Sequence, residues 1–357
     1  MRKWLLCLTA ALVLLTVSAR GAQLPREVER AMPEEGRTLL RGLDLEDGNA
    51  LAEGISRVWE LVREEITGVL RQRLKGAASV LLAVILCGMA ESVSPGEKAA
   101  LYLPMAGGAA VTLLSTGSIG SLIGLGAETI RVLGKFSTAL LPALAAATAA
   151  TGAAVSASLQ RVGTMVLVDM LLQLCSALLV PLVYCYIALL TASACIPGSR
   201  LAPLAEGLKK TIVWLLTTAL LLFTLYLSTV RIVSGAADAV GVRLTRAAIA
   251  GSLPVVGGII SEVAETVLAG AGMLRSVIGV GGMLAILAAC ACPFLQLAVQ
   301  YLLYKLVGLC AGVVGSPALS KLVSGLGGAF GLVLGMTGAC ALLVFLSVLS
   351  FVGVVLP

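Results

Sequence analysis

Long apolar runs dominate the sequence from Gly76 to its end, and only short polar turns separate them. A helix needs about 20 mostly apolar residues to cross the hydrocarbon core of a bilayer. Backbone groups find no hydrogen-bond partners in lipid, so segments of this kind cross as helices. We therefore predict an all-α, polytopic integral membrane helix bundle with seven or eight spans, in a transmembrane domain at residues 76–357. The predicted spans are 76–92, 100–124, 136–156, 162–196, 211–233, 276–303, 306–323 and 328–356.

Two of these runs leave the number of spans and the side of the C-terminus open. Residues 162–196 are too long for one ordinary span and slightly short for two, and Pro181 is placed to break them into two half-length helices. Residues 306–323 form a weak run because Ser316 and Pro317 interrupt it. Positive charge flanks the 211–233 span on both sides, so the positive-inside rule gives no orientation there.

The composition argues against several other classes of protein. Only 12% of the residues are charged and 59% are hydrophobic, whereas an ordinary soluble domain carries about 25% charged residues. The net charge of +6 is not clustered, and no basic stripe with interleaved aromatic residues indicates nucleic-acid binding. Histidine is absent, and the sequence has no phosphate loop, hydrolase elbow or HExxH helix. We therefore expect neither an enzyme nor a bound cofactor.

The nine cysteines predict neither a disulfide framework nor a metal site. None of them falls in the polar segment 23–75. Cys290 and Cys292 lie two residues apart on an expected helix, so they point in different directions, and no other ligands accompany them. We interpret both as small buried hydrophobic residues.

The N-terminus has the organisation of an export signal. Arg2 and Lys3 precede an apolar stretch that ends in small residues at 17–19, so we predict a signal peptide at residues 1–19. An uncleaved short anchor is the alternative. Either one would place the next segment, residues 20–75, outside the cytoplasm.

That segment is strongly polar. Residues 23–75 carry nearly half of all charged residues in the chain. From about Asn49 apolar residues recur every three to five positions, which predicts an amphipathic helix leading into the first span. Its apolar stripe suits the membrane surface, a partner protein or the rest of this chain, and the sequence leaves these three open.

Two polar pairs lie inside apolar runs. Asp169 and Gln173 are four residues apart and share a helical face, as do Gln296 and Gln300 shortly after Pro293. Ionisable groups within spans are costly in lipid and usually face a protein interior or a wet cavity. The pairs fit a polar or proton-sensitive pathway, and they also fit hydrogen bonds that fix helix packing.

Glycines at four-residue spacing form a further pattern. Small residues on one helical face allow two helices to approach closely, so this spacing predicts tight helix packing. The sequence leaves open whether the packing partner belongs to this chain or to another subunit. The most extended set is Gly327, Gly331 and Gly335, and Gly120 with Gly124 and Gly308 with Gly312 repeat the spacing.

The segment 236–275 contains an interrupted element between two strong spans. Its proline and paired glycines interrupt any helix, while its serine is placed to cap a new helix that begins with an acidic residue. A broken or re-entrant helix is tolerated at membrane depth only where protein or water covers its backbone. A plain surface loop is the alternative. The residues of the element are Gly251, Pro254, Gly257, Gly258, Ser261 and Glu262.

The stretch from Arg246 to Glu265 resembles the stage III sporulation protein AE family of endospore-forming bacteria. The similarity centres on residues 253–258 (LPVVGG) and continues at residues 277–282 (VIGVGG). The export signal, the charged segment and the Gly/Ala-rich membrane region agree with the family as well, so the resemblance covers most of the chain.

The resemblance implies an integral membrane subunit of a mother-cell sporulation complex, in the membrane around the engulfed forespore. Such a complex would build a channel or feeding apparatus with a forespore-made partner, and a separate ATPase subunit would supply its energy. The family offers no established catalytic residues. Two alternatives stay open: a stand-alone secondary transporter of a small solute, using Asp169 and the interrupted element, and a non-conducting membrane scaffold.

Overall fold

A computed structural model gives the structure of residues 24–45, 47–93, 97–151, 154–196, 201–252, 257–314 and 317–352. Every regular element in these ranges is a helix, which confirms the all-α fold. The helices are α2 (Arg26–Ala31), α3 (Glu34–Leu40), α4 (Ala50–Val93), α5 (Glu97–Ala150), α6 (Ala154–Gln173), the π-helix η1 (Leu174–Leu179), α7 (Val180–Cys195), α8 (Leu201–Ser252), α9 (Gly257–Val314) and α10 (Pro317–Val352).

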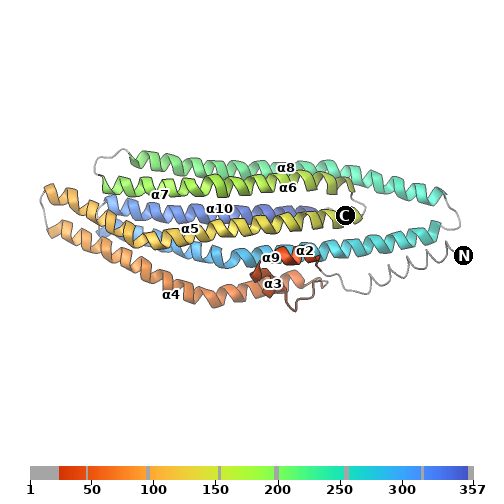
Figure 1. Cartoon of the computed structure of the whole chain (residues 1–357), viewed down its shortest axis with the longest axis horizontal. Coiled ribbons are helices and arrows are strands. Elements are labelled where there is room, and N and C mark those ends of the chain that lie inside the picture. The colour runs from red at the N-terminus through yellow and green to blue at the C-terminus, as the bar shows by residue number, and fades with distance from the viewer. Residues whose placement is uncertain are drawn as a thin grey trace.

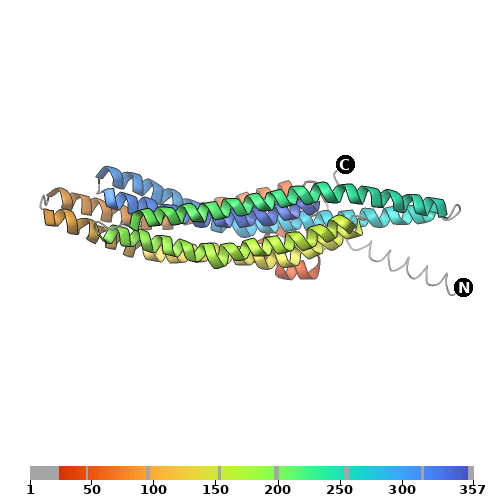
Figure 2. The same ribbon diagram turned by 90° about the horizontal axis from the view of Figure 1, so that it is seen from above.

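The long helices lie side by side in one elongated bundle (Figures 1 and 2). Helix α9 alone has 58 residues, which at a rise of 1.5 Å per residue gives a length of roughly 90 Å. The hydrocarbon core of a bilayer is only about 30 Å thick. The bundle is therefore much longer than a bilayer is thick, and part of it extends beyond the membrane.

Six helices in the described chain are long and apolar enough to cross a membrane, where the sequence predicted seven or eight spans. The predicted span 100–124 and residues 136–150 of the predicted span 136–156 belong to one continuous helix, α5. The weak run 306–323 is no separate helix, because its first half ends α9 and its second half begins α10. The six segments are Ala50–Val93, Tyr102–Ala150, Val162–Cys195, Leu201–Val230, Ala269–Val313 and Pro317–Val352.

The run 162–196 forms one span, so the predicted break at Pro181 is wrong. Helices α6 and α7 continue through the π-helical turns of η1, and Pro181 follows directly at the start of α7. A proline inside an α-helix removes one backbone hydrogen bond and crowds the carbonyl four residues earlier. The wider turns of a π-helix accommodate such a local misfit without ending the helix.

The two ends of the bundle differ. Helices α4, α7 and α9 all end at one end, where α5, α8 and α10 begin (Figure 1). We call it the lysine end, because Lys209, Lys210, Lys305 and Lys321 lie within about three turns of the helix ends there. Helix α10 ends in the opposite half, which we call the terminal half and which also holds α2 and α3 (Figure 1). Both ends of the described chain therefore lie in the terminal half.

Helix α10 occupies the centre of the bundle (Figures 1 and 2). Its side chains from Leu322 to Phe351 are mostly buried, and Phe330 meets the ring of Tyr304 edge-on at a centroid distance of 5.1 Å. No charged residue follows Lys321 in this helix, so its burial costs little desolvation. The axis of the bundle is thus filled with packed side chains.

The polar N-terminal segment packs on the apolar start of the α9 span. Val28 of α2 is fully buried, and Leu39 of α3 packs with Leu284 and Ala288 of α9. Helix α4 begins at Ala50 and runs without a break to Val93, so the amphipathic helix and the first span are one helix. Part of its apolar stripe faces this chain, while Trp59 remains 67% exposed. The predicted signal peptide lies outside the described residues.

Candidate functional site: two sets of polar side chains

One set of polar side chains forms a line along α9, which we call the α9 polar line: Cys292, Gln296, Gln300 and Tyr304. Their four-residue spacing places them on one face of the helix. The Cys292 thiol donates a hydrogen bond to Glu65 Oε2 at 2.8 Å. Arg73 Nη2 donates to Gln296 Oε1 at 3.0 Å.

The last two members of the line meet α5 in the core. The Tyr304 hydroxyl lies 3.0 Å from Ser115 Oγ in a hydrogen bond, and it also contacts the amide of Gln300. Ser115, Gln300 and Tyr304 are each at most 1% exposed. Gln300 Oε1 accepts no hydrogen bond in the described structure. The line therefore runs from exposed Glu65 to an enclosed polar cluster.

The pair Asp169 and Gln173 points the other way. Gln173 Nε2 donates to Asp169 Oδ2 at 2.8 Å, so the predicted pairing is present, but both side chains are exposed on the outside of α6. Their neighbours Val166 and Met170 are exposed as well. The structure does not bring this pair together with Gln296 and Gln300.

Asp169 and Gln173 lie level with a charged turn of α5. A Cβ at Gly134 of α5 would lie 3.6 Å from Leu172 of α6. Helices α5 and α6 are antiparallel (Figure 1), so Gln173 falls between Arg131 and Lys135 along the bundle axis. The charged and amide side chains at this level are exposed, and Glu128 and Arg131 form an ion pair. We call the set the outer polar belt: Glu128, Arg131, Lys135, Asp169 and Gln173.

The predicted glycine face of α10 packs against helices of the same chain. A Cβ at Gly327 would lie 3.2 Å from Tyr304, and one at Gly331 would lie 2.9 Å from the ring of Tyr301. At Gly335 the nearest atom would be 4.0 Å away, in Leu216 of α8. The two tyrosines of α9 thus fit against α10 only because glycine faces them.

The interrupted element lies at the tip of a long hairpin. Helix α8 ends at Ser252 and α9 begins at Gly257, and the two helices extend together beyond the end of α10 (Figures 1 and 2). Residues 253–256, which include Pro254, lie outside the described residues. Gly251 falls in the last turn of α8, while Gly257, Gly258, Ser261 and Glu262 fall in the first turns of α9.

A comparison with protein families identifies the chain. The family model of stage III sporulation protein AE matches residues 50–354, which is most of the sequence. The chain belongs to this family. Membership confirms the resemblance found in the sequence and makes the chain a sporulation membrane protein. No curated protein and no solved structure matches it significantly.

The region that matches the AE family begins where α4 begins and ends just past α10. It contains the α9 polar line, the outer polar belt and the interrupted element. Helices α2 and α3 precede it, and α2 packs on α5 while α3 packs on α9. The N-terminal helices therefore lie outside the matched region.

The structure of this AE-family protein adds residues that the sequence did not single out. The partners of the α9 polar line, Glu65, Arg73 and Ser115, come from helices far away in the sequence. Arg275 is 3% exposed and donates to the carbonyl oxygens of Phe351 and Val352, so it caps the C-terminal end of α10. In the sequence, Arg275 is visible only as a single arginine next to the predicted span 276–303.

The cysteines follow the sequence interpretation only in part. Cys290 is 8% exposed, as expected of a small buried residue, but Cys292 uses its thiol in a hydrogen bond to Glu65. No group of three or more Cys, Asp or Glu side chains within the described part of the chain is arranged to hold a metal ion.

Proposed function

We propose that this protein is an integral membrane subunit of the mother-cell complex that builds a channel or feeding apparatus to the forespore during endospore formation. The observation that supports this most strongly is the AE-family match over residues 50–354. The six apolar helices support a multi-pass membrane protein. The other membrane subunits of the complex, including a separate ATPase, are its partners.

The predicted export signal supports an orientation. A signal peptide at residues 1–19 would place the segment that follows it, which includes α2 and α3, outside the cytoplasm. The terminal half, with α2 and α3, would then face the space between the two cell membranes. Alkaline phosphatase, which is active only outside the cytoplasm, tests this: fused after Val352 it should be active, and fused after Val314 inactive. The reverse pattern would overturn the orientation.

The geometry favours a pathway shared between subunits. Side chains of α10 fill the axis of the bundle, whereas the outer polar belt faces outward beside the exposed apolar residues Val166 and Met170. An ionised aspartate at the centre of a bilayer costs about 2.5–3.5 kcal/mol by insertion scales. A partner subunit that covers Asp169 and Gln173 would remove that cost and place polar groups at a subunit boundary.

The rival function is a stand-alone secondary transporter, and the enclosed Ser115, Gln300 and Tyr304 cluster is the observation that favours it. A non-conducting scaffold is the third possibility. Uptake of small solutes by the purified protein alone in liposomes would support the transporter and count against the proposal.

Deletion of the coding sequence in the native spore-former tests the proposal itself. Development should stop after engulfment, with loss of late forespore gene expression, and the wild-type copy should restore it. The complemented strain should also yield the other membrane subunits and the ATPase when the protein is purified through a tag. Normal sporulation of the deletion strain would overturn the proposal.

A further inference from the structure

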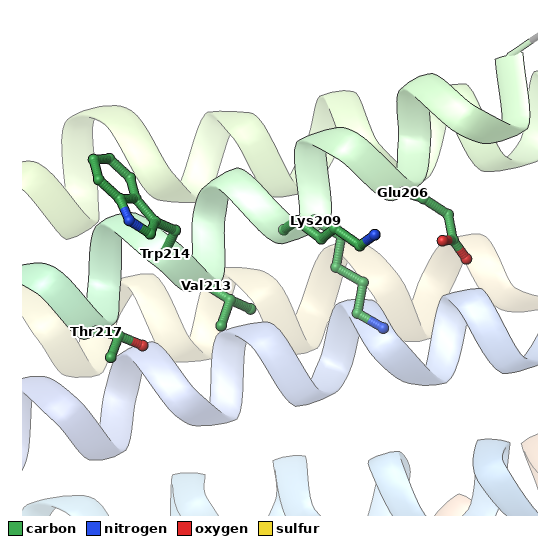
Figure 3. Close-up of a pocket in the computed structure, with 6 residues that line it drawn as sticks. Glu206, Lys209, Val213, Trp214 and Thr217 are labelled. Atoms are coloured by element: carbon green, nitrogen blue, oxygen red, sulfur yellow. The ribbon is translucent and has the colours of Figure 1, made fainter.

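A surface groove lies along α8 at the lysine end. Its volume is about 540 Å³, and it is lined by Glu206, Lys209, Lys210, Val213, Trp214 and Thr217. Figure 3 shows Val213 and Thr217 extending from α8 toward α10, with Glu206 at one end of the groove and Trp214 near the other. The groove is thus charged at one end and mostly apolar at the other.

The charged end of the groove carries two lysines and one glutamate. Among the described residues, neither Lys209 nor Lys210 forms an ion pair with a carboxylate. The Lys209 ammonium reaches toward α10, since a Cβ at Gly328 would lie 3.3 Å from its Nζ. With two lysines and Glu206, the lining residues carry a net charge of +1. A single negative charge would balance it.

The apolar end continues along the exposed face of α8. Trp214 is 64% exposed, and Leu221 and Leu225, at helical spacing beyond it, are each 65% exposed. Only 17% of the most apolar window of this helix is buried, the smallest share among the six candidate spans. Tryptophan is enriched where the headgroups of a bilayer meet its hydrocarbon. From Trp214 to Leu225 the apolar stripe extends about 16 Å.

We propose that this groove binds one anionic phospholipid. Lys209 and Lys210 contact the phosphate of the headgroup, Trp214 lies at the level of the glycerol backbone, and one acyl chain follows Leu221 and Leu225. Lysine binds phosphate as a point charge, and each basic residue near an anionic membrane surface contributes about 1 kcal/mol. The net charge of +1 matches the single negative charge of a phosphodiester such as phosphatidylglycerol. The proposal holds whatever the complex transports.

Native mass spectrometry of the delipidated full-length protein tests it directly. With added phosphatidylglycerol, one bound lipid is expected at an occupancy about tenfold above that seen with phosphatidylcholine. Lys209→Gln/Lys210→Gln should abolish this preference, whereas Lys209→Arg/Lys210→Arg should keep it. The matched control Arg63→Gln/Lys75→Gln removes the same charge from exposed positions of α4 and should leave the preference intact.

Two further measurements separate a lipid from a free phosphate. Excess glycerol 3-phosphate should fail to displace the lipid, and Trp214→Ala should weaken lipid binding severalfold. Equal occupancy by the two lipids, full binding by the Lys209→Gln/Lys210→Gln variant, or displacement by glycerol 3-phosphate would each overturn the proposal.

Discussion

The α9 polar line and the outer polar belt have the same sequence signature but opposite positions in the bundle. Both contain polar residues four positions apart inside apolar runs. In the α9 polar line, Gln296 and Tyr304 bond to side chains of α4 and α5, and the deepest members are fully buried. In the outer polar belt, the partner of the Gln173 side chain among the described residues is Asp169, on the same helix. The first set holds this chain together, and the second remains available to another.

The largest expected effect is at the buried end of the α9 polar line. Tyr304→Ala should lower the free energy of unfolding by about 3–5 kcal/mol, because it removes a fully buried ring that packs on Phe330. Unfolding of the purified protein by SDS titration measures this. Tyr184, which is 44% exposed, is the control, and Tyr184→Ala should cost less than about 1 kcal/mol. Equal losses at both sites would contradict the burial difference.

The next effect compares the two polar sets directly. Gln296→Leu should cost about 2 kcal/mol, because it leaves the half-buried guanidinium of Arg73 without its partner. Gln173→Leu on the exposed face should change the free energy of unfolding by less than about 0.5 kcal/mol. The same SDS titration distinguishes them, and a larger loss at Gln173 than at Gln296 would reverse the assignment of inner and outer sets.

The smallest effect concerns the glycine faces. Gly331→Ala should cost about 1 kcal/mol, since the new methyl group would lie 2.9 Å from the ring of Tyr301. Gly124, in the corresponding pattern on α5, has no heavy atom within 4 Å of a Cβ placed there. Gly124→Ala should therefore raise stability by about 0.5 kcal/mol through its helix propensity. The two substitutions should differ in sign, and a gain at Gly331 would contradict the close packing of α9 on α10.

The sequence predicts the helical membrane fold well because hydropathy and helix periodicity depend on local residues. It wrongly predicts breaks in helices where a charged turn or a proline lies within a helix that continues in the structure. The charged turn at Glu128, Arg131 and Lys135 suggested a break between two spans, yet these side chains simply face outward from one continuous helix. Pro181 suggested another break, but the helix continues there because the π-helical turns before Pro181 accommodate the missing backbone hydrogen bond.

The sequence predicts which polar residues of the candidate site share a helical face, but not which residues they contact. A spacing of four residues shows that Asp169 and Gln173 share a helical face, but it does not say what that face meets. The partner of Gln296 is Arg73, which lies 223 positions away in the sequence. Only the three-dimensional arrangement of α4, α5 and α9 reveals such long-range pairs.

The central claim is that the outer polar belt meets another subunit, and co-purification from sporulating cells tests it most directly. Tagged Asp169→Leu/Gln173→Leu protein should reach the membrane in normal amounts but retain about tenfold less of its partner subunits, because the polar contact is lost. The control Met170→Leu, on the same exposed face, should retain them as the wild type does. Full retention of the partners by the double variant, together with normal sporulation, would contradict the account.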